Sequence, residues 1–207
     1  LLTPLGIFMF FQITWQFKIV IYREIKAEIY RGIKMRPTKR NRLFIVTGAS
    51  CVGKTTTCEI LFKNEKDYIV MESDLLWSDV FNTPEENYRA YREIWMSLCS
   101  NISQIGMPVV LCGCAIPEQF EVCDNRKYFS EVIYIAIAAE KDELIKRMKY
   151  GRSVTDENWI KSSVQFNEWL KNNATKTTPC IILVDNTHMR SDETASKIDE
   201  IIRMNIV

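Results

Sequence analysis

The chain has 207 residues, of which 47% are hydrophobic and 26% are charged. This length and balance predict one folded domain of moderate size. The formal net charge is +1, so the charge of the whole chain gives no argument for binding nucleic acid. The seven cysteines have no regular spacing, which indicates reduced thiols and a cytoplasmic protein rather than a disulfide framework.

Residues 1–41 form an N-terminal extension whose composition differs from the rest. Its first 20 residues are mostly apolar and aromatic with Lys18 as their one charge, and the chain then turns basic. Three interpretations stay open: an appendage that the functional domain does not need, a peripheral helix, or a membrane anchor. About 17 residues before Lys18 reach only the lower limit of a spanning helix, so membrane contact through residues 1–22 is not favoured. We expect the functional domain at 42–207.

From residue 43 onward, short apolar runs alternate with longer segments of helical spacing. The apolar runs predict strands at 43–47, 68–71, 108–112, 131–138 and 180–184. The other segments predict helices at 54–62, 84–104, 140–150, 156–172 and 191–204. This alternation is typical of an α/β domain in which helices cover both faces of a parallel sheet.

The first strand-to-helix turn carries a phosphate-binding motif. Residues 48–55 read GASCVGKT and fit the pattern G-x-x-x-x-G-K-[ST]. Glycines let the backbone approach a phosphate, and the loop N–H groups with the next helix N-terminus bind anions. Lys54 is expected to reach the β- and γ-phosphates of ATP, and Thr55 to ligate Mg²⁺. The residues predicted to bind the nucleotide here are Gly48, Ala49, Ser50, Cys51, Val52, Gly53, Lys54, Thr55 and Thr56.

Three further segments bear on the use of that phosphate. The second strand is followed by the acidic segment ESD (72–74), the third runs into Gly113 without an acid, and LIKRMKYGR (144–152) follows the fourth. With these motifs, residues 42–207 resemble the P-loop kinases of small molecules, the group of shikimate, gluconate and adenylate kinases and chloramphenicol phosphotransferase. The resemblance implies a three-layer P-loop fold with a five-stranded parallel sheet in the order 2-3-1-4-5 and a short lid.

The resemblance also implies roles for single residues. Asp74 would position the acceptor hydroxyl or serve as the second Mg²⁺ contact, with Glu72 as the weaker candidate and helix N-capping as the structural alternative. Gly113 would let the substrate approach the backbone. Arg147 and Arg152 would close over ATP and stabilise the transferred phosphoryl group, unless they are only a solvated basic helix end.

Two loops and two residue types complete the predicted site. Asp185 and Thr187 follow the fifth strand, where related kinases hold adenine, although an ordinary capped turn is the alternative. Arg126 lies where relatives often bind a substrate or phosphate with an arginine.

The cysteines near Gly113 are too few for a zinc site and are interpreted as buried thiols. The aromatic residues at helical spacing are interpreted as core, with Trp77 equally a wall of the acceptor site: Trp77, Trp95, Trp159, Phe166 and Trp169.

The leading hypothesis is an ATP- and Mg²⁺-dependent kinase. It would move the γ-phosphoryl group to a hydroxyl or phosphate of a small metabolite, nucleoside or nucleotide, as a monomer or homodimer. The missing acid after the third strand argues against an ATP-driven motor. Two alternatives stay open: a kinase of polynucleotides or proteins that grips phosphate with the basic residues 36–42, and a non-catalytic ATP-binding module tethered by the extension. DNA is not an expected partner, and RNA is not favoured.

Overall fold

The computed structural model describes residues 42–64, 67–77 and 87–206 of the chain. The N-terminal extension and the expected helix start at Pro84 lie outside these residues. No helix in the described ranges has the length and apolar character that crossing a bilayer requires.

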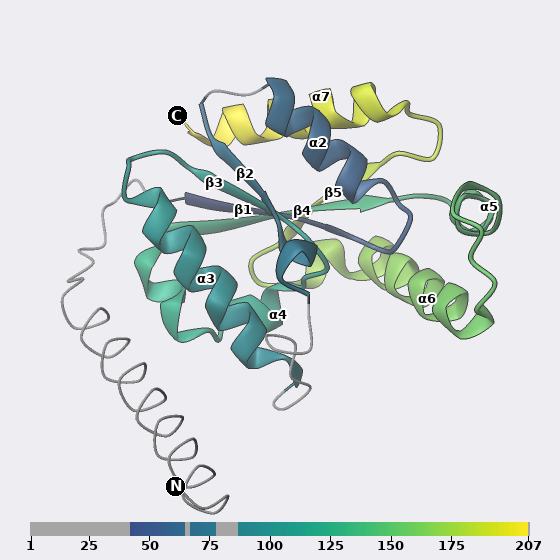
Figure 1. Cartoon of the computed structure of the whole chain (residues 1–207), viewed down its shortest axis with the longest axis horizontal. Coiled ribbons are helices and arrows are strands. Elements are labelled where there is room, and N and C mark those ends of the chain that lie inside the picture. The colour runs from purple at the N-terminus through teal and green to yellow at the C-terminus, as the bar shows by residue number, and fades with distance from the viewer. Residues whose placement is uncertain (1–41, 65–66, 78–86, 207) are drawn as a thin grey trace, which may run out of the picture. The chain divides into compact units, whose positions relative to one another are not determined.

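Five parallel strands form one sheet in the order β2-β3-β1-β4-β5 (Figure 1). Their bounds are β1 (Arg42–Gly48), β2 (Ile69–Glu72), β3 (Val109–Cys112), β4 (Glu131–Ala138) and β5 (Ile181–Asp185). In the central register, Leu43 of β1 pairs with Val109 of β3 and Val132 of β4. The predicted fold class and strand order are confirmed.

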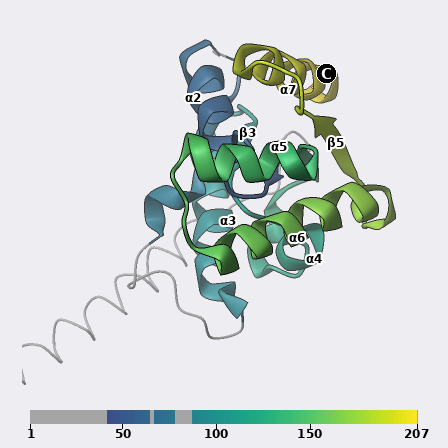
Figure 2. The ribbon, with the colours of Figure 1, turned by 90° about the vertical axis from the view of Figure 1, so that its right-hand side faces the viewer.

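Helices cover both faces of this sheet (Figure 1). On one face lie α2 (Lys54–Asn64) and α7 (Ser191–Ile206), and on the other lie α3 (Arg89–Ser103), α4 (Pro117–Phe120) and α6 (Glu157–Asn173). The side view shows α5 (Lys141–Lys146) and α6 next to each other in front of the sheet (Figure 2). Shorter turns complete the fold: η1 (Ser73–Leu76), η3 (Asp124–Tyr128), η4 (Arg147–Gly151) and η5 (Ala174–Lys176).

The core consists of two layers because alternate side chains of each strand point to opposite faces. Phe44 and Val46 of β1 pack in the cluster under α2 and α7, whereas Leu43 and Ile45 pack in the cluster under α3 and α6. All four side chains are almost completely buried. Burial of each such side chain stabilises the fold by about 1.5–3 kcal/mol, which explains why the central strands read as unbroken apolar runs.

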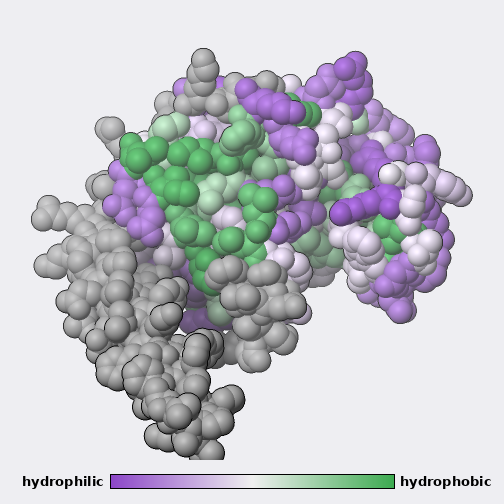
Figure 3. Space-filling model, viewed as in Figure 1, coloured by the Kyte–Doolittle hydropathy of each residue, from purple (hydrophilic) through white to green (hydrophobic). Residues whose placement is uncertain are grey.

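Part of the apolar surface remains exposed on the side seen in Figure 1. Apolar side chains gather there over α3 and the sheet edge at β2 (Figure 3). Exposed members of these elements are Leu98 and Ile105, which lie in and just after α3, and Leu75 in the turn after β2.

Candidate active site

The loop between β1 and α2 has the geometry that its motif predicts. The Lys54 ammonium donates hydrogen bonds of 2.8 Å to the carbonyl oxygens of Gly48 and Ala49, so the side chain folds back over the loop. A Cβ atom on Gly48 would lie 2.6 Å from the Ile137 carbonyl oxygen of β4. The first glycine of the motif is therefore required by close packing against the neighbouring strand.

A cavity of about 530 Å³ opens over this loop. We call it the phosphate cavity. Its lining includes the loop and first helical turn at residues 50–57, together with Asp74, Arg147, Arg152 and Asn186. Gly48 and Ala49 are buried beneath the loop. Most residues predicted to bind ATP are thus brought together around one space.

Two oxygen-bearing side chains meet at the edge of the phosphate cavity. The Thr55 hydroxyl donates a 2.5 Å hydrogen bond to the Glu72 carboxylate, because β1 and β2 end at the same edge of a parallel sheet. A hydroxyl and a carboxylate oxygen are ligands that Mg²⁺ accepts, so this pair fits the metal predicted for Thr55. No group of three or more His, Cys, Asp and Glu side chains suited to a metal occurs in the part of the chain that the structure describes.

Asp74 lies two residues beyond Glu72, in the 3₁₀ turn η1. Its side chain is exposed and lines the phosphate cavity. The residue at the N-cap of this turn is Glu72, which makes no side-chain capping bond. The capping explanation for Asp74 therefore has no support in the geometry, while its position at the cavity agrees with a role in the reaction.

Arg147 links the predicted lid segment to the phosphate loop, because its guanidinium donates to the Val52 carbonyl at 3.4 Å. Its guanidinium donates to the Glu143 carboxylate at 2.9 Å and to the Asn186 side-chain oxygen at 3.0 Å. The bond from Arg147 lowers the pKa of Glu143 below its ordinary value. Further bonds reach the carbonyl oxygens of Asn186 and Thr187. These bonds hold the arginine against the wall of the phosphate cavity.

Asn186 is a site residue that the sequence analysis did not single out. Its side-chain amide donates a 2.7 Å hydrogen bond to the carbonyl of Val52 in the phosphate loop, and its oxygen accepts from Arg147. The residue is 5% exposed. The signal available in the sequence was an asparagine just after the predicted fifth strand. An amide side chain at such a position is often buried, and a buried amide needs hydrogen-bond partners.

The predicted lid segment contains a π-helical turn at Arg147–Gly151 where a continuous helix was predicted. The Arg152 N–H donates to the carbonyl of Arg147 at 3.1 Å. Residues five apart in an α-helix lie about 140° apart around the axis. A turn closed by an i to i−5 hydrogen bond reduces this angle, so that the two residues lie nearer to the same face. Both predicted lid arginines consequently line the same cavity.

Trp159 covers the phosphate loop and is not the core residue that its spacing predicted. Its indole N–H donates a 3.2 Å hydrogen bond to the Ser50 hydroxyl, and the side chain is 39% exposed. The Arg152 guanidinium lies 5.7 Å from the centre of its ring, within cation–π range. The start of α6 therefore covers the phosphate loop beside the predicted lid segment.

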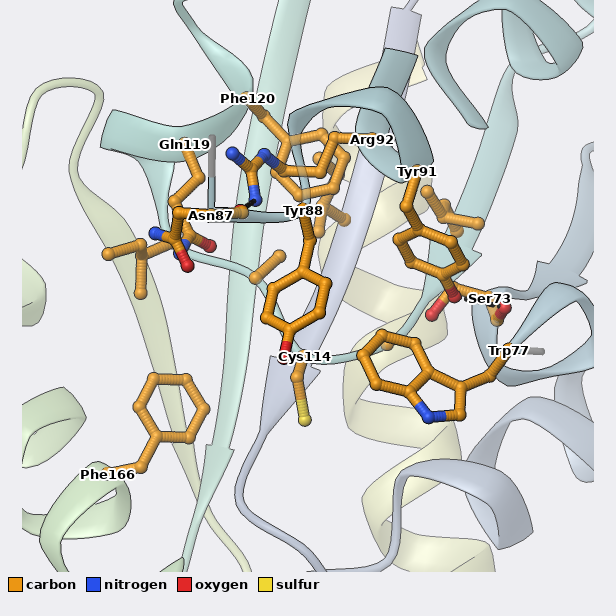
Figure 4. A pocket seen from close by; sticks show the side chains of 15 residues that line it. Ser73, Trp77, Asn87, Tyr88, Tyr91, Arg92, Cys114, Gln119, Phe120 and Phe166 are labelled. Carbon is orange, nitrogen blue, oxygen red and sulfur yellow. Dashed lines mark hydrogen bonds between the residues drawn. The ribbon is translucent and has the colours of Figure 1, made fainter. Parts of the chain in front are cut away.

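A second cavity of about 400 Å³ lies beside the first and has largely aromatic walls (Figure 4). We call it the acceptor cavity. Trp77 packs edge-on against Tyr91, with ring centres 5.2 Å apart, and lies 5.5 Å from the ring of Tyr88. Phe120 and Phe166 complete the aromatic lining. Of the two interpretations of Trp77, the structure supports a wall of this cavity.

The side chain of Cys114 lies where the two cavities meet, since this residue lines both. It is exposed, whereas Cys112 and Cys123 are buried. Burial raises the pKa of the Cys123 thiol to about 11, and a hydrogen bond with Cys58 together with burial raises that of Cys112. The expectation of buried thiols is therefore right for these two and wrong for Cys114.

Gly113 lines the acceptor cavity. Close packing explains why a glycine occupies this position. A Cβ atom there would lie 1.9 Å from the Ser73 hydroxyl oxygen. The neighbouring ends of β2 and β3 leave no room for a side chain at this position. The predicted contact of Gly113 with substrate stays a prediction.

Arg126, Asp185 and Thr187 line neither cavity. Arg126 forms a 2.7 Å ion pair with Glu121 and donates to the Phe129 carbonyl. Asp185 accepts hydrogen bonds from the backbone and hydroxyl of Thr187, which lower its pKa. These contacts agree with the ordinary capped turn that was the alternative for residues 185–187, and they give Arg126 a local structural role.

Similar solved structures share this architecture. No protein-family model matches the sequence, and no curated protein matches it. A sugar kinase from Janibacter sp. HTCC2649 aligns with a TM-score of 0.61 and 15% identity, covering 80% of this chain and 96% of that one. The tunicamycin resistance protein of Deinococcus radiodurans aligns at 0.57 and 12%, covering 79% and 96%.

A third solved structure extends the likeness. A gluconokinase from Sinorhizobium meliloti 1021 aligns with a TM-score of 0.51 and 14% identity, covering 81% of this chain and 98% of that one. The chain has the fold of small-molecule P-loop kinases. At these identities the likeness establishes the fold alone, and the chemistry has to be argued from the site.

Proposed function

We propose that the protein is an ATP-dependent kinase that phosphorylates a hydroxyl group of a small molecule bound in the acceptor cavity. The observation that carries this proposal is the junction of the two cavities at Cys114. A nucleotide bound over the phosphate loop would present its γ-phosphate toward a neighbouring space of about 400 Å³. That volume lies in the range of pockets that bind small ligands.

The cationic residues of the phosphate cavity would bind and polarise ATP. Lys54 would exchange its two carbonyl contacts for phosphate oxygens. Arg147 and Arg152 would stabilise the charge on the phosphoryl group during transfer. Arg147 is already held by Glu143 and Asn186, so little reorganisation is needed to keep its charge in place.

The Thr55–Glu72 pair would hold Mg²⁺, which supplies charge neutralisation for the phosphates when it is bound. We therefore favour Glu72 over Asp74 as the carboxylate that supports the metal, reversing their order in the sequence analysis. Asp74 would then be available to the acceptor. The hydroxyl oxygen forms a bond to the γ-phosphorus, the bond to the ADP oxygen breaks, and the Asp74 carboxylate accepts the hydroxyl proton.

The test is ADP release from Mg-ATP in the presence of a panel of hydroxyl compounds. The panel contains nucleosides, sugar acids and aromatic alcohols, and the sugar kinase and gluconokinase among the similar structures justify the sugars. We expect at least one compound to stimulate turnover, and Lys54→Ala to reduce it about 100-fold or more. Stimulation by RNA or protein alone would favour the polynucleotide or protein kinase, and tight ATP binding without turnover on any acceptor would favour the non-catalytic module.

A further inference from the structure

The indole of Trp159 contacts the phosphate loop through a hydrogen bond that a ligand can replace. Its N–H donates to the hydroxyl of Ser50 at 3.2 Å, and Ser50 lines the phosphate cavity. An indole N–H donates and cannot accept, so the serine oxygen is the acceptor. A phosphate oxygen carries negative charge and would accept the same hydrogen bond more strongly than a neutral hydroxyl.

Lys54 makes contacts of the same kind. Its ammonium donates to the carbonyl oxygens of Gly48 and Ala49 at 2.8 Å, although this ammonium is the group that the motif assigns to the phosphates. The Lys54 ammonium and the Trp159 indole N–H therefore both contact neutral oxygen atoms of the loop. Each would exchange these atoms for phosphate oxygens when a nucleotide binds.

The ring of Trp159 also contacts a cation of the phosphate cavity. The Arg152 guanidinium lies 5.7 Å from the centre of this ring, and Arg152 lines the cavity. In the described ranges no carboxylate pairs with Arg152, whereas Arg147 pairs with Glu143 at 2.9 Å. A cation–π contact orients a guanidinium and leaves its charge in place. The indole therefore holds Arg152 at the cavity without neutralising it.

The first turn of α6 fixes the backbone that carries this indole. The Asp156 carboxylate caps the helix and accepts hydrogen bonds from two backbone N–H groups, one of which belongs to Trp159. Lys149 of the predicted lid segment pairs with Glu157 at 2.9 Å. The predicted lid segment and the start of α6 are thus connected at two points, Lys149 to Glu157 and Arg152 to Trp159. A movement of the indole would take Arg152 with it.

We propose that Trp159 recognises the γ-phosphate of ATP and so discriminates ATP from ADP. The backbone N–H groups of such loops hold the α- and β-phosphates, so a donor that covers the loop from outside meets the phosphate that remains. The indole N–H leaves the Ser50 hydroxyl for an oxygen of the γ-phosphate, and the ring holds Arg152 against the same group. ADP offers neither contact. The proposal rests on the part of the proposed function that places ATP over the loop, and it does not depend on phosphoryl transfer.

The ratio of the ADP and ATP dissociation constants tests this role. Both constants are measured by calorimetry on the full chain with Mg²⁺ present. Trp159→Phe keeps an aromatic ring beside Arg152 and removes the N–H. We expect the preference for ATP over ADP to fall about tenfold, as the loss of a hydrogen bond to a charged group predicts, with most of the change in the affinity for ATP. A preference that stays at the wild-type value in Trp159→Phe overturns the proposal.

Two further variants separate phosphate recognition from a structural role. Ser50→Ala removes the partner of the indole in the ligand-free protein, and the preference for ATP should be kept or rise, because the phosphate no longer competes with the serine. Equal losses of preference in Ser50→Ala and Trp159→Phe would mean that the contact only fixes the start of α6, which contradicts the proposal. Trp169→Phe changes an indole of the same helix that stacks on Phe166, and the preference should stay at the wild-type value.

Tryptophan fluorescence gives a second readout. ATP should change the emission of the wild type more than ADP does, because only ATP moves the Trp159 indole. This difference should disappear in Trp159→Phe and persist in Trp169→Phe, and equal responses of the wild type to both nucleotides contradict the proposal. A preference for ATP that depends on Trp159, without turnover on any acceptor, refutes the kinase reaction and leaves the role of Trp159 standing. Turnover with an unchanged preference in Trp159→Phe does the reverse.

Discussion

The hydroxyl of Thr55 and the carboxylate of Glu72 meet at 2.5 Å across the edge of the sheet. This contact links the first helical turn after the phosphate loop to the end of β2, and it would provide the proposed metal site with a carboxylate. We expect Glu72→Gln to weaken the Mg²⁺-dependent part of ATP binding about tenfold or more. ATP titrations with and without Mg²⁺ measure this. Glu59→Gln, an exposed change on α2, is the control.

Asp74 tests the acceptor side of the reaction. Asp74→Asn should lower phosphoryl transfer about 100-fold or more, because the amide cannot accept the proton of the hydroxyl. The affinity for ATP should change little, since Glu72 rather than Asp74 contacts Thr55. Turnover and ATP affinity are measured on the same preparation. Transfer at the wild-type rate in this variant would mean that Asp74 has no part in the chemistry.

The Asn186 amide should contribute to both stability and nucleotide binding. Asn186→Ala removes the partner of the buried Val52 carbonyl and one partner of Arg147. We expect a loss of about 1–3 kcal/mol in the free energy of unfolding, together with weaker ATP binding. Urea denaturation and ATP titration report the two effects. Asn158→Ala, on the exposed start of α6, should change neither.

Gly113 and Ser73 should be coupled. Gly113→Ala places a methyl group 1.9 Å from the Ser73 hydroxyl, and such overpacking costs about 1–3 kcal/mol of stability. The double variant Gly113→Ala with Ser73→Gly should recover part of that loss, which thermal unfolding can detect. Gly151→Ala meets no atom within 4 Å and serves as the matched control. Equal stability losses in the single and double variants would contradict the coupling.

The turn after β5 predicts a pH dependence. Hydrogen bonds from Thr187 hold the pKa of Asp185 below its usual 3.8. Because the folded-state pKa is the lower one, this stabilisation is present above pH 3.8 and is lost as the pH falls through the folded-state value. Asp185→Asn should therefore be less stable than the wild type at neutral pH, and the difference should shrink in acid. Urea denaturation at pH 7 and below pH 3.8 measures it.

The fold could be predicted because its signals are local. Each central strand is buried on both faces and therefore reads as an apolar run, and the phosphate loop is a contiguous motif. The contacts of Asn186 and Trp159 could not be predicted from such local signals. Asn186 bonds to Val52 across 134 positions and Trp159 to Ser50 across 109, so their partners are defined only by the folded chain.

Two further interpretations of the phosphate cavity show the same limit. Helical spacing placed Trp159 in the core, yet its indole lies over the phosphate loop. Spacing identifies a face of a helix but not what that face meets. The relative importance of the two acids after β2 could not be predicted from the sequence either, because Glu72 reaches Thr55 only where β1 and β2 end at the same edge of the folded sheet, on either side of β3.

The five-residue turn Arg147–Gly151 makes the lid sensitive to length as well as to residue type. An i to i−5 turn holds one residue more than an α-helical turn. If these residues relaxed into an ordinary α-helix with none removed, Arg152 would lie about 140° around the axis from Arg147. Every side chain would then be retained while the two arginines no longer faced one phosphate. Deleting one residue at the same time would leave the arginines four positions apart, about 40° around the axis, and would restore the shared face. The number of residues between the two arginines and the helix type must therefore change together.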